Sequence, residues 1–289
     1  MVIALAGLVG GAIVATITRQ QRFYRGASQL LDVREGVRDA MEVLSTDLRG
    51  MSVADTVKLA ADSAIEFFAT IGGSVVCTIG GNDIGLPAAH SSGNSLTAFL
   101  SEPDTGDLAL FHIDSADAWE RHRIAGFARQ ALTSSCPPTS QLSDQSDLDA
   151  GAKGFVVALT TPLSDDIKPG AVVRFVRRAR YSLYRANDGD WYLGYRRCNA
   201  IGSSACGAVQ PVSGPYRGYN RDQRATGLLF EYFNGAGQTL DVAAAPLALA
   251  RVDITARSES EHRLPNGAPF ARRVADSATV SIAIRNRPK

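Results

Sequence analysis

The 289-residue sequence has no excess of charge of either sign. Lys and Arg together number 30, Asp and Glu together number 29, and the formal net charge is +1. Proteins that bind nucleic acid over a broad surface usually carry a strong positive field. We therefore do not expect nucleic acid as a partner.

Motifs for metal binding and catalysis are also scarce. The four cysteines form no C-x-x-C pair and the four histidines are scattered, which argues against zinc. No G-x-S-x-G motif marks a serine nucleophile, and the two TIGG segments lack the lysine of a phosphate-binding loop. His112 and His122 lie near acidic residues, but no nucleophile is marked beside them. We expect no enzymatic activity, no cofactor and no small-molecule substrate.

Charge is missing altogether from the first 18 residues, MVIALAGLVGGAIVATIT. As a helix this run would span about 27 Å, just short of the ~30 Å hydrocarbon core of a bilayer. Three interpretations compete: a secretory signal, an ordinary membrane anchor, or a membrane and filament helix whose start lies upstream of Met1. The residues assigned to the membrane or filament contact are Val2, Ile3, Leu5, Leu8, Val9, Ile13, Val14 and Ile17.

An apolar stripe with steps of three and four residues follows this run. Its members are predicted to pack against a head domain, and they are Phe23, Leu30, Val37, Met41, Leu44 and Leu48. A stripe of this period indicates an amphipathic helix. No proline precedes Pro87, so the two segments are predicted to form one helix of about 50 residues. A coiled-coil dimerisation stalk is the alternative.

Beyond residue 51 the pattern changes to short apolar runs separated by turn-forming residues. Examples are Leu108–Ile113, Ala171–Ala186 and Asp190–Arg197, with an Asn187-Asp188-Gly189 turn between the last two. The predicted fold class is α+β, with a long N-terminal helix packed on an antiparallel, β-rich head. The predicted division is a helix over residues 1–50 and a head domain over residues 51–289.

Three segments carry a resemblance to a known family. They are the apolar helix running into QQRFYR and LLDVREGVRDAMEVLSTDLRG, the segments 174–198 and 227–240, and the ending TVSIAIRNR at residues 279–287. Together they resemble the type IV pilin and type II secretion pseudopilin superfamily. The likeness is greatest to its large minor subunits, the J-type pseudopilins and W-type minor pilins. The processing motif of that family is absent, and we expect it to lie upstream of Met1.

The resemblance implies a non-enzymatic minor pilin or pseudopilin with a pilin-like fold. Such a subunit would cross the bacterial inner membrane once and hold its head in the periplasm, or at an extracellular filament tip. It would assemble through its N-terminal helix into a type IV pilus-like or type II secretion filament. Its partners would be other minor subunits, the major subunit and inner-membrane lipid. The alternative is a membrane-anchored envelope enzyme or substrate-binding protein with a β-rich head.

The four cysteines are disulfide candidates. Cys198 and Cys206 bracket a short loop, CNAIGSSAC, whose closure would contribute about 2–3 kcal/mol. Cys77 and Cys136 would be left to pair, although four cysteines allow three connectivities. Four free thiols are the other interpretation.

An arginine-rich hairpin offers a candidate partner contact. Arg174, Arg178 and Arg180 lie on alternate positions of its first strand, with tyrosines interleaved. Such a surface can hold carboxylates of another subunit or clamp single-stranded nucleic acid, but it can equally be the polar face of a sheet. Two acidic clusters, around Asp188 and around Asp147, are weaker candidates for Ca²⁺, with plain turns as the simpler interpretation.

Overall fold

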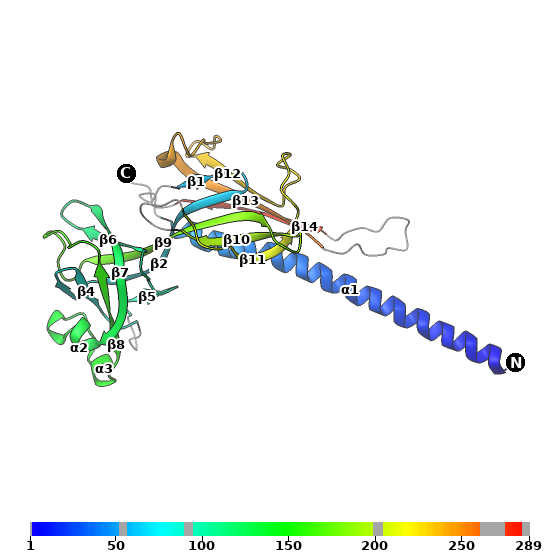
Figure 1. Cartoon of the computed structure of the whole chain (residues 1–289), viewed down its shortest axis with the longest axis horizontal. Coiled ribbons are helices and arrows are strands. Elements are labelled where there is room, and N and C mark those ends of the chain that lie inside the picture. The colour runs from blue at the N-terminus through cyan, green and yellow to red at the C-terminus, as the bar shows by residue number, and fades with distance from the viewer. Residues whose placement is uncertain (1, 52–56, 90–94, 199–204, 261–274, 285–289) are drawn as a thin grey trace.

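A long helix begins the chain and runs into a two-lobed head (Figure 1). The computed structural model describes residues 2–51, 57–89, 95–198, 205–260 and 275–284, and of residues 2–9, 22, 26 and 246 it describes the backbone only. The helix is α1 (Val2–Arg49), 48 residues long. The absence of proline before Pro87 leaves its backbone hydrogen bonds uninterrupted.

Fourteen strands form one antiparallel sheet in the described part of the chain. They are β1 (Leu59–Ala60), β2 (Ala64–Val75), β3 (Thr78–Gly80), β4 (Asp83–Leu86), β5 (Ala98–Phe99), β6 (Leu108–Ile113), β7 (Ala118–Ala131), β8 (Lys153–Leu159), β9 (Val172–Arg185), β10 (Trp191–Arg197), β11 (Gln210–Tyr216), β12 (Leu228–Asn234), β13 (Leu249–Glu259) and β14 (Ala275–Ala283). Short helices are α2 (Leu132–Ser135) and α3 (Gln145–Asp149), with 3₁₀ turns η1 (Pro138–Ser140) and η2 (Pro246–Ala248).

The strand order is β12-β13-β11-β10-β9-β6-β7-β8-β4-β3. The strand β14 pairs with β13, and β2 pairs with β1, β5 and β9. The two long strands β2 and β9 are paired from Ala64–Ser182 to Val75–Val172, with a register shift between Thr70 and Gly72. They connect the two lobes, as Figure 1 shows.

Each lobe has its own hydrophobic core. The helix lobe is built from α1 and β10 to β14, and its core includes Leu44, Leu48, Tyr181, Val252 and Ile254. The second lobe is built from β3 to β8 with α2 and α3, and its core includes Phe111, Phe155 and Phe175. The register shift in β2 falls where the strand passes from the first core to the second. Residues Ile65 and Phe67 therefore serve the helix lobe, whereas Ile71 serves the second lobe.

The predicted α+β, pilin-like fold is wrong. A large antiparallel β-sheet dominates the described residues, and the one long helix is not apolar enough along its described length to be a membrane helix. Among the described residues, no helix is long and apolar enough to cross a membrane. This finding contradicts the prediction of a transmembrane helix. It also removes the basis for placing the protein in the inner membrane with a periplasmic head, or at a filament tip. The division at residue 50 stays a prediction.

Candidate functional site

The second half of α1 is packed into the helix lobe. Its buried residues repeat every three or four positions, and each is at most 4% exposed: Val33, Val37, Ala40, Leu44 and Leu48. Gly36 lets the helix approach strand β11 closely, because a Cβ at this position would lie 3.2 Å from the Gly214 carbonyl oxygen. This half of the helix is thus a fixed part of the head.

Two tyrosines tie this half to the sheet. The Tyr216 hydroxyl donates to the Gly36 carbonyl oxygen over 2.5 Å, and the Tyr181 hydroxyl donates to Asp47 Oδ2 over 2.5 Å. Burial raises the pKa of Asp47 above its usual range, and the hydrogen bond from Tyr181 offsets only part of that effect. Burial likewise raises the pKa of Tyr216 to about 12. Both tyrosines therefore act as neutral hydrogen-bond donors at neutral pH.

The first half of α1 projects away from the head (Figure 1). Its large apolar side chains are exposed: Ile13 54%, Val14 64%, Ile17 48%, Phe23 72%, Tyr24 70% and Leu31 63%. At about 100° per residue, Ile13, Ile17, Tyr24 and Leu31 fall within about 40° of one another. We call these four residues the projecting stripe. It lies about 200° around the helix from the buried residues, so it faces away from the head.

The projecting stripe is widened on both flanks. Val14 and Phe23 lie about 90° from its centre on opposite sides. Added side chains at Gly10 and Gly11 would meet no atom within 4 Å. Large apolar side chains therefore reach about 90° to either side of the stripe centre, with polar side chains such as Gln20 between them.

The predicted helix-to-head contact is corrected at its start. Phe23 was predicted to pack on the head but is 72% exposed, because the head covers the helix only from about Val33 onward. Leu30 is half-buried, Met41 packs at the edge of the core, and Val37, Leu44 and Leu48 are buried. In the predicted membrane or filament set, Ile13, Val14 and Ile17 are exposed. The side chains of Val2, Ile3, Leu5, Leu8 and Val9 lie outside the described residues.

The arginine-rich hairpin turns its charges inward. Glu66 on β2 is 1% exposed and accepts hydrogen bonds of 2.6 Å from the Nε atoms of both Arg178 and Arg180. Arg174 stacks its guanidinium 5.3 Å above the Trp119 ring. A buried carboxylate of the same chain thus holds the charges of Arg178 and Arg180, and their contact with a partner stays a prediction.

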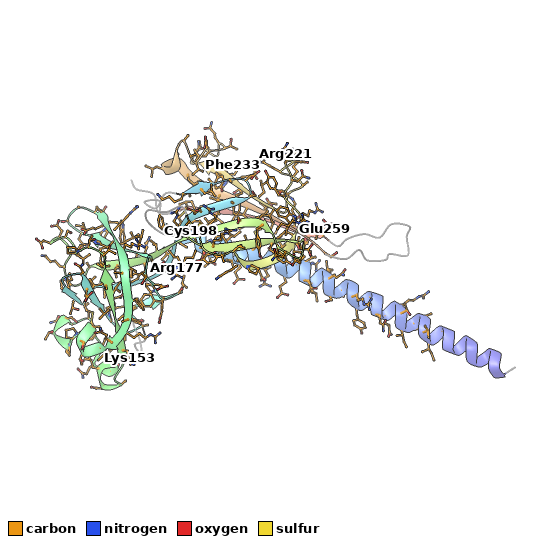
Figure 2. All side chains as sticks on the ribbon, in the orientation of Figure 1. Lys153, Arg177, Cys198, Arg221, Phe233 and Glu259 are labelled. Atoms are coloured by element: carbon orange, nitrogen blue, oxygen red, sulfur yellow. A yellow bond between two sulfur atoms is a disulfide. The ribbon has the colours of Figure 1, made fainter. Side chains whose placement is uncertain are left out.

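A second buried carboxylate lies between the lobes. Asp107, 2% exposed, accepts a 2.8 Å bond from Arg177 Nη2 and a 3.1 Å bond from Arg197 Nη2. Figure 2 shows Arg177 in the region where the lobes meet, near Cys198. Arg197 also donates to Asp104 and holds the pKa of that carboxyl below its usual range. These ion pairs link the loop before β6 to β9 and β10.

Glu66, Cys198 and Cys206 have the residue types of a metal site, but the two cysteines form a disulfide. The Oε2 atom of Glu66 lies 3.9 Å from Cys198 Sγ and 4.0 Å from Cys206 Sγ. Among the described residues, this is the only group of three side chains with metal-binding atoms close enough to share one ion. The two sulfurs are bonded to each other, so neither is a thiolate ligand. Two guanidinium groups already neutralise the carboxylate. The donor set therefore does not fit a cation.

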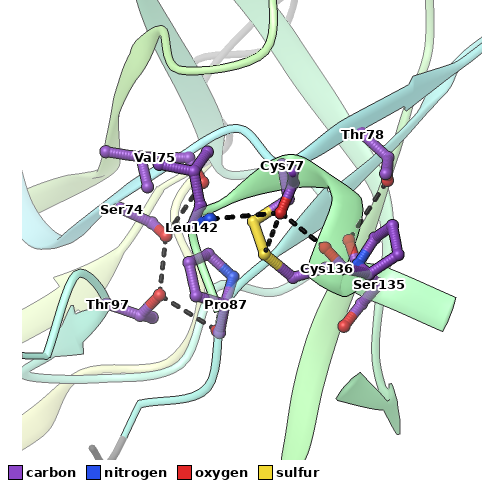
Figure 3. The surroundings of a disulfide bond; sticks show 11 residues. Ser74, Val75, Cys77, Thr78, Pro87, Thr97, Ser135, Cys136 and Leu142 are labelled. Atoms are coloured by element: carbon purple, nitrogen blue, oxygen red, sulfur yellow. Dashed lines mark hydrogen bonds between the residues drawn. A yellow bond between two sulfur atoms is a disulfide. The ribbon is translucent and has the colours of Figure 1, made fainter. Parts of the chain in front are cut away.

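The two disulfides join the predicted pairs, Cys77–Cys136 and Cys198–Cys206. Figure 3 shows the first, which ties the end of α2 to the segment between β2 and β3. Nearby, Thr78 donates to the Ser135 carbonyl oxygen over 3.1 Å, which reinforces the same connection.

The histidines lie in two separate networks. His112 bonds Asp114 and Asp117 at the β6–β7 turn, and the hydrogen bond to Asp114 raises its pKa. His122, on β7, bonds Glu120 over 2.5 Å and Thr161 over 2.9 Å. The predicted alternative, an enzyme or binding protein with both histidines in one pocket, gains no support from this separation.

The His122 network has the residue types of a nucleophilic site. With Nε2–H donating to Glu120, Nδ1 accepts the proton of the Thr161 hydroxyl. However, Ser164 N–H and Oγ both donate to Glu120, over 3.1 Å and 2.5 Å. That N–H is not free to stabilise an oxyanion. Burial raises the pKa of Glu120, but the bonds from Ser164 and His122 outweigh it and lower the pKa overall. The network holds the loop after β8 onto β7.

The acidic clusters have local roles. Asp188 accepts bonds from the Asp190 N–H and the Tyr192 hydroxyl, as in a hairpin turn. Asp144 caps α3 by accepting from the Ser146 N–H over 2.9 Å. Their oxygens complete turns and caps rather than converging on an ion.

No family model matches the chain, and neither a curated protein nor a solved structure is significantly similar to it. The resemblance to pilins and pseudopilins is therefore not supported by any of the three comparisons.

Proposed function

We propose that this protein is a non-enzymatic subunit that associates with further copies of itself through the projecting half of α1. The observation that carries the proposal is the exposed stripe of Ile13, Ile17, Tyr24 and Leu31 on the face opposite the head. Large apolar side chains that line up on one exposed face often mark a binding surface.

The spacing of the stripe favours another helix as the partner. Ile17, Tyr24 and Leu31 repeat every seven residues, with Ile13 four residues before Ile17. A seven-residue repeat places side chains along one seam, where they can interlock with the same repeat on a second helix. The second copy of this chain supplies such a helix. Because the stripe faces away from the head, a second helix can lie along it without meeting the first head.

The flanking residues favour more than one neighbouring helix. Val14 and Phe23 extend the apolar surface beyond the width of a two-helix seam. Full burial of such a side chain contributes about 1.5–3 kcal/mol, and the six residues are each only 48–72% exposed, so burying the rest of them contributes on the order of 5–10 kcal/mol in total. Association itself costs about 4–15 kcal/mol. A bundle that buries both flanks is thus favoured over a dimer that buries only the stripe.

Sedimentation velocity of the full chain tests the proposal. The wild-type protein is expected to form assemblies that grow with concentration in the micromolar range. Leu31→Glu and Tyr24→Glu place a charge in the seam and are expected to yield monomers. Ala15→Glu adds the same side chain about 180° from the centre of the stripe, away from both flanks, and is expected to behave as wild type. A monomeric wild-type protein, or equal effects of all three substitutions, would contradict the proposal.

A further inference from the structure

An open groove lies on the second lobe, far from α1. It has a volume of about 720 Å³, within the range of small-ligand sites. Its lining includes Phe99 on β5, Leu100 and Glu102 after it, Arg129 on β7, and Lys153 and Phe155 on β8. None of them takes part in the proposed association.

The floor of the groove is aromatic and rigidly held. The Phe99 ring lies edge-to-face against Phe155 and Phe127, with centroid distances of 5.1 Å and 5.6 Å. Gly72 is required for this arrangement, because a Cβ there would lie 2.7 Å from the Ala98 carbonyl oxygen. Phe155 is 2% exposed, whereas Leu100 at the rim is 78% exposed. Phe155 is therefore closed to a ligand, and the accessible apolar surface of the groove is Leu100 together with the uncovered part of Phe99.

The charges around the groove do not cancel. Arg129 Nε donates to Glu102 over 3.1 Å, and the guanidinium carbon lies 5.6 Å above the Phe155 ring. These two side chains neutralise each other. Lys153, labelled in Figure 2 on the outer part of this lobe, forms no ion pair with any described residue. One positive charge is left at the edge of an aromatic floor.

We infer that this groove binds an organic anion with an aromatic body, of which 2-naphthoate is a simple representative. The ring of the ligand packs on Leu100 and on the outer face of the Arg129 guanidinium, and its carboxylate pairs with the Lys153 ammonium. An ion pair at this partly open position sets the orientation of the ligand, while the aromatic contacts supply most of the affinity.

Isothermal titration of the full chain with 2-naphthoate tests the inference. The expected result is saturable binding with a dissociation constant of about 1 mM or tighter. The uncharged 2-naphthalenemethanol is expected to bind at least about fivefold more weakly, since it lacks the charge that Lys153 recognises. Acetate, which has the charge without the ring, is expected not to bind.

Three variants locate the site. Lys153→Glu is expected to weaken 2-naphthoate about tenfold, and Glu102→Gln to tighten it, because the second change adds to the positive charge of the groove. Lys168→Glu alters another exposed lysine outside the groove and is expected to leave binding unchanged. Circular dichroism checks that each variant is folded. No saturation by 10 mM (about ten times the expected constant), equal binding of the alcohol, or equal losses in Lys153→Glu and Lys168→Glu would overturn the inference.

Discussion

Replacing Glu66 by Gln tests whether the arginines of the central hairpin are internal structure. Glu66 is 1% exposed, and its two oxygens accept separately from Arg178 and Arg180, whose side chains are 14% and 29% exposed. Gln keeps the shape and one acceptor but loses the charge, and its amide group faces a guanidinium. Removing one member of a buried ion-pair network costs about 3–5 kcal/mol.

The lower end of that range is expected here. Arg180 is partly exposed and can recover hydrogen bonds from water, so we expect Glu66→Gln to lower the free energy of unfolding by about 3 kcal/mol. Urea titration followed by circular dichroism measures it as a lower midpoint with an unchanged slope. Glu102→Gln is the matched control. It breaks an exposed pair with Arg129, so it is expected to cost less than about 1 kcal/mol. Equal effects of the two variants would refute the reasoning.

Three further perturbations have defined outcomes. Replacing both Cys77 and Cys136 by Ser, which opens a link with a sequence separation of 59, is expected to lower the free energy of unfolding by about 4 kcal/mol in denaturant titration. Asp114→Asn is expected to lower the pKa of His112 in an NMR titration, because Asp114 is the main cause of its raised value. The raised pKa stabilises the folded state fully below the ordinary histidine pKa, and this contribution is lost as the pH rises through the folded value. Tyr216→Phe removes the hydroxyl that holds α1, and is expected to cost about 1–2 kcal/mol and to speed amide exchange in the packed half of the helix.

The disulfide and Tyr216 variants each have a matched control. Opening the Cys198–Cys206 link, with a separation of only 8, is expected to cost less, about 2.5 kcal/mol. An equal cost for both disulfides would contradict the loop-closure argument. Tyr219→Phe removes an exposed hydroxyl bonded to Asp62 and is expected to change stability little. If Tyr219→Phe and Tyr216→Phe have the same effect, the Tyr216 hydroxyl does not anchor the helix.

The sequence predicts α1 well as a helix but not where the head stops covering it. The lack of proline and the three- and four-residue steps are local signals, and they extend without a break from Phe23 to Leu48. Whether Val33 is buried and Phe23 exposed depends on where β11 and β14 lie against the helix. A local sequence pattern does not contain this information. A heptad stripe also drifts by about 20° per repeat around a straight helix, so its first member turns away from the face that Leu44 occupies.

Local sequence patterns also do not predict every strand of the sheet or the partners of the buried charges. Strand β7 has no clean alternation, because AWERHRIAGFARQA passes from one sheet partner to another at a register shift between Ile124 and Gly126. It was not predicted. The partner of Arg178 is Glu66, 112 residues away in the chain, so the sequence alone left that arginine as a surface charge. The lining of the groove comes from segments between residues 88 and 155, and only folding brings them together.

The family resemblance failed for a related reason. An apolar helix followed by short, arginine-bearing strands is a local pattern that many folds can contain, and it does not specify how strands are ordered. The disulfides, in contrast, could be anticipated in part. The short loop between Cys198 and Cys206 makes their pairing easy, and the other two cysteines then remain for each other.

Cross-linking between copies through α1 tests the central claim most directly. The described cysteines are all in disulfides, so a single new cysteine reports on one position. Leu31→Cys and Tyr24→Cys are expected to form intermolecular disulfides under mild oxidation, seen as dimers on a non-reducing gel, whereas Ala15→Cys, on the opposite face, is expected to remain monomeric. Equal cross-linking at all three positions, or none at Leu31 and Tyr24, would contradict association through the projecting stripe.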